Sequence, residues 1–147
     1  MKRSADLVVI GAGVVGLALA NRWLEVYPGN SVIILEKEDD VAMHASGRNS
    51  GVLHAGFYYA PDTLKARLTR DGNKMLREFC AEAGVLVKDP GKVVVTTSHK
   101  QLPALETLYS RGVANGVELE RIDEKQLREL EPLARTVSAA LWSPTTG

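Results

Sequence analysis

The sequence contains only one cysteine, Cys80, so no disulfide can form within these 147 residues, which fits a reducing location. It also lacks an excess of charge, because 18 basic residues balance 18 acidic ones and no basic block is present. A nucleic-acid-binding surface is therefore excluded. Glycines interrupt every apolar stretch before it reaches the roughly 20 residues needed to span a bilayer. We therefore expect a cytoplasmic protein without an integral membrane segment, and peripheral membrane association stays open.

The chain has few aromatic residues, 5%, but its hydrophobic fraction of 45% is enough for the packed core of about one soluble domain. Its basic start is followed at once by Asp6, so no targeting peptide is expected. No residue is assigned to a metal site.

A glycine motif follows the first apolar run, residues 6–10, and precedes an apolar helical stretch. Gly11 allows a tight turn, Gly13 lets the backbone approach a pyrophosphate, and Gly16 lets the helix pack closely on the sheet. The amides of the helix start, including those of Val14 and Val15, would face the phosphates. The motif predicts an adenine dinucleotide site; the alternative is a glycine-rich turn in an ordinary βαβ unit.

An acidic residue closes the second predicted strand, residues 31–36. Glu36 lies twenty residues after Gly16, where a carboxylate accepts hydrogen bonds from a ribose diol. Lys37 follows it and is included in the predicted cofactor site. The motif and Glu36 together allow either NAD or FAD.

A loop rich in glycine and polar residues comes next, and it supplies side-chain donors and exposed backbone amides. These groups suit a second phosphate and the polar edge of a ring. The candidate residues are Ser46, Gly47, Arg48, Asn49, Ser50 and Gly51. For Arg48, the alternative is a surface ion pair of little energetic value.

The run Ser-Gly-Arg-Asn-Ser-Gly-Val-Leu-His-Ala-Gly-Phe-Tyr-Tyr at residues 46–59 resembles the amino-acid-oxidase superfamily of FAD-dependent oxidoreductases. Within that superfamily it is most similar to the L-2-hydroxyglutarate oxidase/dehydrogenase group. The resemblance implies that the glycine motif holds the FAD pyrophosphate and Glu36 the adenosine ribose. It places residues 46–51 along the pyrophosphate, ribityl chain and flavin, and it implies hydride transfer from a small 2-hydroxy acid to flavin N5.

His54 is the candidate base, and the resemblance places it on the substrate side of the flavin. An imidazole changes protonation near neutral pH, so it suits removal of a hydroxyl proton. Covalent flavin attachment, a ligand-orienting hydrogen bond and a buried structural role remain open. Tyr58 and Tyr59 are weaker candidates for a substrate carboxylate, and simple packing explains them equally well.

The pattern after residue 60 predicts a helix over 64–80 with Gly84 as its terminator, and a hairpin of two strands over 85–97. Two further helices would start with capping boxes, Ser98 with Gln101 and Asp123 with Gln126, although Pro103 favours a later start for the first of them. The fold class is therefore α/β: a Rossmann-like FAD-binding βαβ unit with the start of an inserted α+β region. We divide the chain into residues 1–85, part of the FAD-binding domain, and residues 86–147, an incomplete substrate-side region.

The resemblance also implies a longer enzyme, of which this chain would be the N-terminal part, with no turnover and little FAD retention by itself. An open sheet edge would favour a homodimer. Two other functions stay open: a glycerol-3-phosphate or amine/amino-acid oxidase on the same scaffold, and a non-catalytic nucleotide-binding or interaction module.

Overall fold

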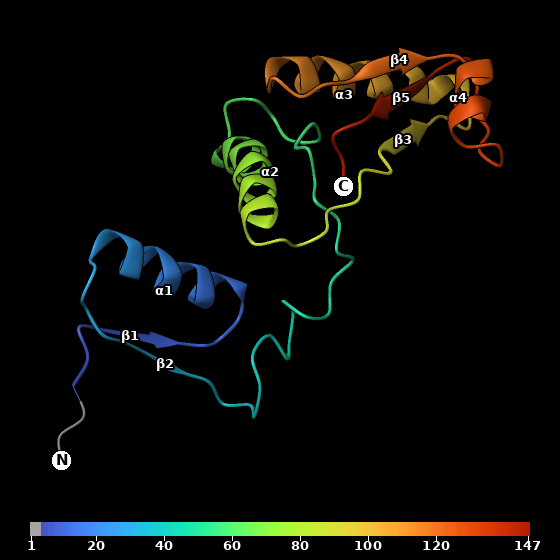
Figure 1. The fold of residues 1–147 in the computed structure, drawn as a ribbon. Helices are drawn as coiled ribbons and strands as arrows, with labels where there is room; N and C mark the ends of the chain where they lie inside the picture. Colours follow the sequence, from blue (N-terminus) through green and yellow to red (C-terminus); the bar gives the residue numbers. More distant parts are fainter. Residues whose placement is uncertain (1–3) are drawn as a thin grey trace. The chain divides into compact units, whose positions relative to one another are not determined.

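The computed structural model describes residues 4–147, which form two compact units divided between Gly51 and Val52 (Figure 1). The first unit is a βαβ motif and the second combines helices with an antiparallel sheet. The mixed α/β class predicted from the sequence is confirmed.

The first unit contains β1 (Leu7–Ile10), α1 (Val14–Val26) and β2 (Val32–Leu35), and its two strands are parallel with Leu7 opposite Val32. Its small core includes Val9, Ala12 and Ala20. Asp6 binds Ser31 through its carboxylate, which ties the starts of the two strands together at 2.7 Å. The predicted strand, helix and strand are all present.

The second unit begins with the residues that lead to α2 (Leu64–Glu82). Thr63 caps this helix, because its Oγ1 accepts a hydrogen bond from the amide of Ala66 at 3.2 Å. The chain leaves the helix through Gly84, whose φ of +67° lies in the left-handed region that favours glycine. The helix and its glycine terminator both match the sequence pattern.

A three-stranded antiparallel sheet forms the other part of this unit. Its order is β3 (Lys92–Val95), β5 (Ala140–Ser143), β4 (Glu120–Ile122), with Val93 opposite Trp142. The predicted hairpin over 85–97 is therefore wrong: residues 85–91 form no strand, and β3 pairs with β5 instead. Next to this pairing, the Trp142 ring of β5 fills the place where a side chain would stand at Gly91.

Two helices cover this sheet (Figure 1). A short 3₁₀ turn, His99–Gln101, leads into α3 (Leu102–Ala114), and α4 is Glu124–Leu130. The predicted capping box of α4 is confirmed: Asp123 accepts from the amide of Gln126 at 2.8 Å, and the Gln126 side chain accepts from that of Asp123 at 2.9 Å. The box predicted at Ser98 does not form, since the Gln101 side chain accepts from Thr97 instead.

One cluster of buried side chains, Ile122, Leu127 and Ala140, lies where α4 meets the sheet. A second cluster, Ala55, Phe57 and Val117, comes from segments outside the helices and strands, and Val94 of β3 packs against it. The compact units divide at residue 51, whereas the functional boundary predicted at residue 85 stays a prediction. Over residues 4–147, no helix combines the length and apolarity that a membrane crossing requires.

Candidate cofactor site

The start of α1 presents backbone amides at the glycine motif. Gly13 precedes the helix and offers no capping side chain, and the first turn contains no acidic residue. The amides of Val15 and Gly16 belong to this first turn, so they have no acceptor within the helix. A Cβ on Gly16 would lie 2.1 Å from the carbonyl oxygen of Gly11, so only glycine allows the helix to approach the strand this closely. The geometry fits a pyrophosphate at the helix start.

Glu36 lies beside this turn and binds it directly. One carboxylate oxygen accepts from the amide of Ala12 at 2.7 Å, and the other accepts from the amides of Lys37 and Glu38 at 2.8 and 3.1 Å. The Ala12 hydrogen bond is the largest of the causes that lower the pKa of Glu36, so this carboxylate stays ionised. A carboxylate has about four lone-pair positions, which leaves capacity for a ribose hydroxyl.

Ser46 reaches the same helix start from the loop. Its Oγ accepts from the amide of Val14 at 2.9 Å, and a Cβ on Gly13 would lie 3.1 Å from that Oγ. The amide of Ala42 also donates to the carbonyl of Ala12 at 3.0 Å. The structure therefore brings Ser46 and Glu36 together at the glycine motif, and their contacts with a cofactor stay predictions. A hollow of about 470 Å³ is lined by β1, the glycine turn, α1 and Ser46.

Residues 47–51 have different local roles. Asn49 uses its side chain to shape its own turn, because its Nδ2 donates to the carbonyls of Ala45 and Ser46 at 3.1 and 2.8 Å and its Oδ1 accepts from the amide of Gly51 at 2.7 Å. Gly47 passes close to Ala42, where a Cβ would lie 2.4 Å from the carbonyl oxygen. Lys37, Arg48 and Ser50 are exposed.

The sequence did not predict a side-chain hydrogen bond that spans the start of this loop. His44 Nε2 lies 2.7 Å from Glu38 Oε1, and this hydrogen bond is the first cause of the lowered pKa of Glu38. Ala42 adopts a φ of +58°, which is uncommon for alanine and turns the chain toward Ala12. No local signal in the sequence indicates either feature, because the partners meet only once the turn has formed.

The remaining candidates lie in the second unit. His54 is exposed, whereas Tyr58 and Tyr59 are half-buried. The Tyr58 ring stacks on Phe57 with 4.4 Å between centroids, and the Lys92 ammonium lies 4.7 Å from the Tyr58 centroid. Lys65 lies 4.5 Å from the centroid of Tyr59. Both tyrosines therefore have packing roles, and the roles of all three residues toward a substrate stay predictions.

Comparison with known proteins decides the family. The FAD dependent oxidoreductase family, DAO, matches residues 6–147. The chain belongs to this family. It is 41% identical over 145 residues to the mitochondrial L-2-hydroxyglutarate dehydrogenase of Homo sapiens, which covers 98% of the chain and 31% of that protein. It is 44% identical over 143 residues to the corresponding protein of Caenorhabditis elegans, covering 97% and 33%. The chain thus spans about a third of the length of these relatives.

Solved structures of several enzymes share the fold. L-alpha-glycerophosphate oxidase from Mycoplasma pneumoniae, with FAD bound, superposes with a TM-score of 0.83 at 25% identity, covering 99% of this chain and 38% of that one. L-proline dehydrogenase from P. horikoshii gives a TM-score of 0.84 at 22% identity, covering 100% and 38%, which supports the fold alone. The resemblance found in the sequence is confirmed, and FAD is the cofactor of the DAO family.

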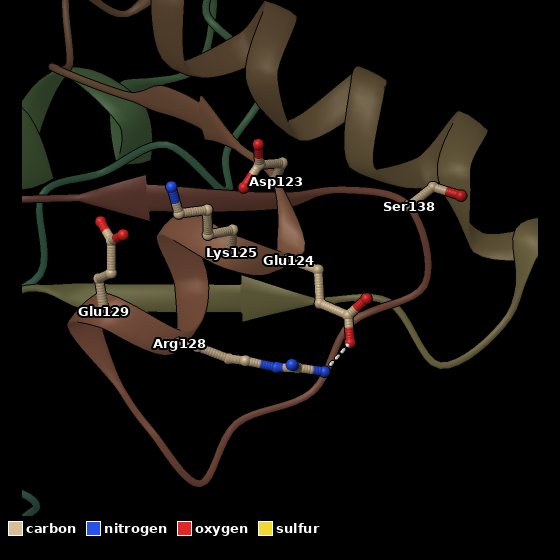
Figure 2. Close-up of a pocket in the computed structure, with 6 residues that line it drawn as sticks. All are labelled: Asp123, Glu124, Lys125, Arg128, Glu129 and Ser138. Atoms are coloured by element: carbon tan, nitrogen blue, oxygen red, sulfur yellow. Dashed lines mark hydrogen bonds and ion pairs between the residues drawn. The ribbon is translucent and has the colours of Figure 1, made fainter.

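A second hollow, of about 590 Å³, lies in the second unit at the start of α4 (Figure 2). Its lining consists of exposed charged and polar side chains, and within it Arg128 pairs with Glu124 at 2.6 Å. The residues drawn are Asp123, Glu124, Lys125, Arg128, Glu129 and Ser138. Charges of both signs lie along this seven-residue helix, as is usual for a solvated surface.

Proposed function

We propose that this protein is an FAD-dependent oxidoreductase that oxidises a small 2-hydroxy acid, L-2-hydroxyglutarate. The observation that carries the proposal is the 41% identity, over 98% of this chain, to a protein named L-2-hydroxyglutarate dehydrogenase. The matched region includes the glycine motif, Glu36 and the loop that contains Ser46. The substrate is part of the proposal because the chain spans only about a third of that relative.

The first unit would bind the adenosine diphosphate part of FAD. The first-turn amides of α1 would hold the pyrophosphate, Ser46 would add a hydroxyl at the same helix start, and Glu36 would accept from the ribose. Gly47, Arg48 and Gly51 stay predicted contacts further along the cofactor, together with the exposed Lys37 and Ser50. When bound, FAD supplies the acceptor for the hydride that leaves the substrate α-carbon.

His54 would take the proton from the substrate hydroxyl. Its exposure leaves the imidazole accessible to a ligand, and imidazole changes protonation near neutral pH. The exposure also disfavours the alternative of a buried structural histidine. Tyr58 and Tyr59 are proposed as weaker contacts for the substrate carboxylate.

The test uses the product of the complete reading frame, loaded with FAD and kept free of oxygen. L-2-hydroxyglutarate, glycerol 3-phosphate and glycine are each added, and the loss of the flavin absorbance is followed. The proposal expects rapid bleaching by L-2-hydroxyglutarate. Bleaching by glycine alone, or by none of the three, would contradict it.

A second candidate function is oxidation of glycerol 3-phosphate. It rests on the superposition with an L-alpha-glycerophosphate oxidase at a TM-score of 0.83. The same experiment separates the two, because bleaching by glycerol 3-phosphate and not by L-2-hydroxyglutarate would select this alternative. A cytoplasmic location and a homodimer through an open sheet edge stay predictions.

A further inference from the structure

The backbone around His54 is held by Asn73 of α2 and by Asn115, the residue that follows α3. Residues 53–59, here called the His54 segment, have no regular secondary structure. At one end, Leu53 and Gly147 exchange two backbone hydrogen bonds, of 2.6 and 3.1 Å. At the other end, the Asn115 amide group donates to the carbonyls of Gly56 and Tyr59 at 3.2 and 3.0 Å. The segment is therefore fixed on both sides of the exposed imidazole.

Asn73, on α2, binds the backbone of His54 itself. Its Nδ2 lies 3.1 Å from the carbonyl oxygen of His54 and 3.4 Å from those of Leu53 and Thr145. The two hydrogens of one amide group are thus shared among three carbonyls. This side chain joins the His54 segment, α2 and the C-terminal residues at one point.

Arg77 fixes the orientation of that amide. It lies four residues further along α2, on the same face of the helix, and its Nε donates to Asn73 Oδ1 at 3.0 Å. A guanidinium only donates, so the amide oxygen must face Arg77 and the NH₂ group must face the three carbonyls. Arg77 is itself held by the carbonyl of Thr145 at 2.8 Å and by Asp89 at 2.6 Å.

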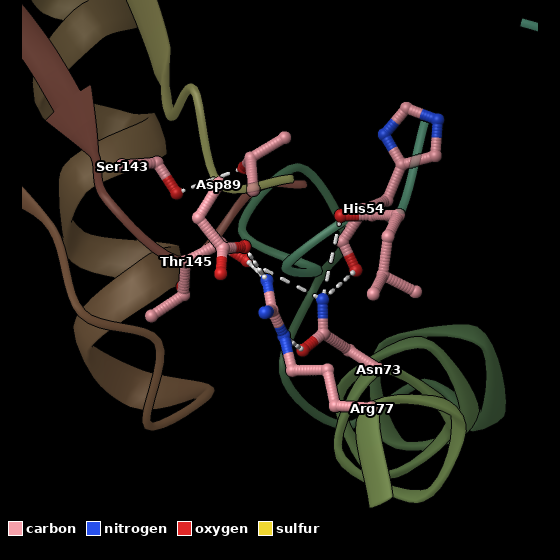
Figure 3. Close-up of polar contacts among 8 residues, drawn as sticks. His54, Asn73, Arg77, Asp89, Ser143 and Thr145 are labelled. Carbon is pink, nitrogen blue, oxygen red and sulfur yellow. Dashed lines mark hydrogen bonds and ion pairs between the residues drawn. The ribbon is translucent and has the colours of Figure 1, made fainter. Parts of the chain in front are cut away.

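Figure 3 shows how this network relates to His54. The carbonyl of His54 faces Asn73, whereas the imidazole points away from the network. The hydrogen bonds therefore restrain the peptide that carries the ring and leave both ring nitrogens available. Such restraint matters for a proton acceptor, because a misplacement of about 1 Å can cost about 100-fold in rate.

We propose that Asn73, oriented by Arg77, is a positioning residue that holds His54 for its reaction with substrate. The inference rests on the proposed function, in which His54 takes the hydroxyl proton. The competing role is a purely structural link between α2 and the His54 segment. If Asn73 positions His54, replacing Asn73 lowers kcat only when the His54 imidazole is present. If Asn73 has a purely structural role, its replacement lowers kcat whether or not the imidazole is present.

The experiment is a double-mutant cycle in the FAD-loaded product of the complete reading frame. It compares Asn73→Ala, His54→Ala and the double variant by kcat and KM for L-2-hydroxyglutarate, with flavin content measured for each. We expect Asn73→Ala to lower kcat by about 10- to 100-fold with KM and flavin content unchanged. In the His54→Ala background, the same change should alter kcat by less than about twofold.

Two further variants complete the design. Arg77→Lys keeps a cation beside Asp89 but removes the Nε donor to Asn73. We expect this variant to lose less kcat than Asn73→Ala, and only when His54 is present. It replaces Asn73→Ala as the test if Asn73→Ala does not fold. Lys74→Ala is the matched control on the same helix, with unchanged kcat expected. Equal losses in both His54 backgrounds, or an active Asn73→Ala, would overturn the inference. An inactive parent would instead contradict the proposed function.

Discussion

At Gly16, a single hydrogen atom in place of a side chain decides whether the helix can meet the strand. A Cβ there would lie 2.1 Å from the Gly11 carbonyl oxygen and 3.1 Å from Val9 Cγ1, and backbone cannot move as the end of a side chain can. We expect Gly16→Ala to destabilise the βαβ unit by about 1–3 kcal/mol and to reduce FAD content. Thermal unfolding and the flavin-to-protein absorbance ratio of the purified variant provide the measurement.

Gly72→Ala is the control for this change. Gly72 lies within α2, and nothing is within 4 Å of the place its Cβ would occupy. Alanine there should raise stability by about 0.5–1 kcal/mol through helix propensity and leave flavin content unchanged. Equal behaviour of the two variants would show that close packing is not the function of Gly16.

The pair of Asp89 and Arg77 predicts a pH dependence. The hydrogen bond from Arg77 is the largest of the causes that lower the pKa of Asp89 below its ordinary value of 3.8. A lowered pKa in the folded state gives a stabilisation that is present above pH 3.8 and is lost as the pH falls through the folded-state pKa. Asp89→Asn should therefore unfold at a lower temperature than the parent at pH 6, and the difference should shrink toward pH 3. A difference that grows toward acid pH would contradict this origin.

Residue chemistry made part of the cofactor site predictable. Gly11, Gly13 and Gly16 follow from backbone sterics, and Glu36 follows from its place at the end of an apolar strand. The sequence did not show that Asn49 turns its side chain onto its own backbone, because that choice depends on the carbonyls its loop brings within reach. It also gave no sign of the positive φ of Ala42.

At the scale of the element, the α4 capping box offers a contrast with the uncapped start at Ser98. Replacing Asp123 by alanine removes the acceptor for the Gln126 amide and should cost about 1 kcal/mol. The amides of α4 should then exchange with solvent about fivefold faster, as hydrogen-exchange mass spectrometry can measure. Ser98→Ala is the matched control, because Ser98 makes no side-chain capping bond, and it should leave exchange unchanged. A similar acceleration in both variants would argue against the capping box as the cause.

Local elements were predictable where their signals are local. Helix α2 is predicted by apolar residues at helical spacing, and the start of α4 is predicted by its capping-box residues, Asp123 and Gln126. The wrong hairpin shows the limit, because Asp89-Pro90-Gly91 has the composition of a turn whichever strand lies beyond it. The partner of β3 is β5, more than 40 residues later, and Trp142 fills the space at Gly91. Pairing between strands so far apart in the sequence depends on tertiary packing, which a short stretch of sequence does not reveal.

At the scale of the whole molecule, the apolar surface of the first unit bears on cofactor retention. Ile10 and Val15 are 88% and 79% exposed, and β1 and β2 form a sheet of only two strands. A sheet of two strands is only marginally stable in water. When a ligand binds only the folded state, part of its binding free energy is used to fold the unit, so its apparent affinity falls. We therefore expect a polypeptide of residues 1–147 to bind FAD weakly and to turn over no substrate.

The visible spectrum of that polypeptide, purified and then mixed with FAD and desalted, tests this expectation. We expect little absorbance near the flavin band, whereas the product of the complete reading frame, treated in the same way, should stay yellow. A stoichiometric flavin in the 147-residue polypeptide would show that the glycine turn, Glu36 and Ser46 hold the cofactor without further contacts. The glycine turn, Glu36 and Ser46 all contact the start of α1. Stoichiometric flavin would therefore show that the exposed apolar face of β1 does not weaken FAD binding.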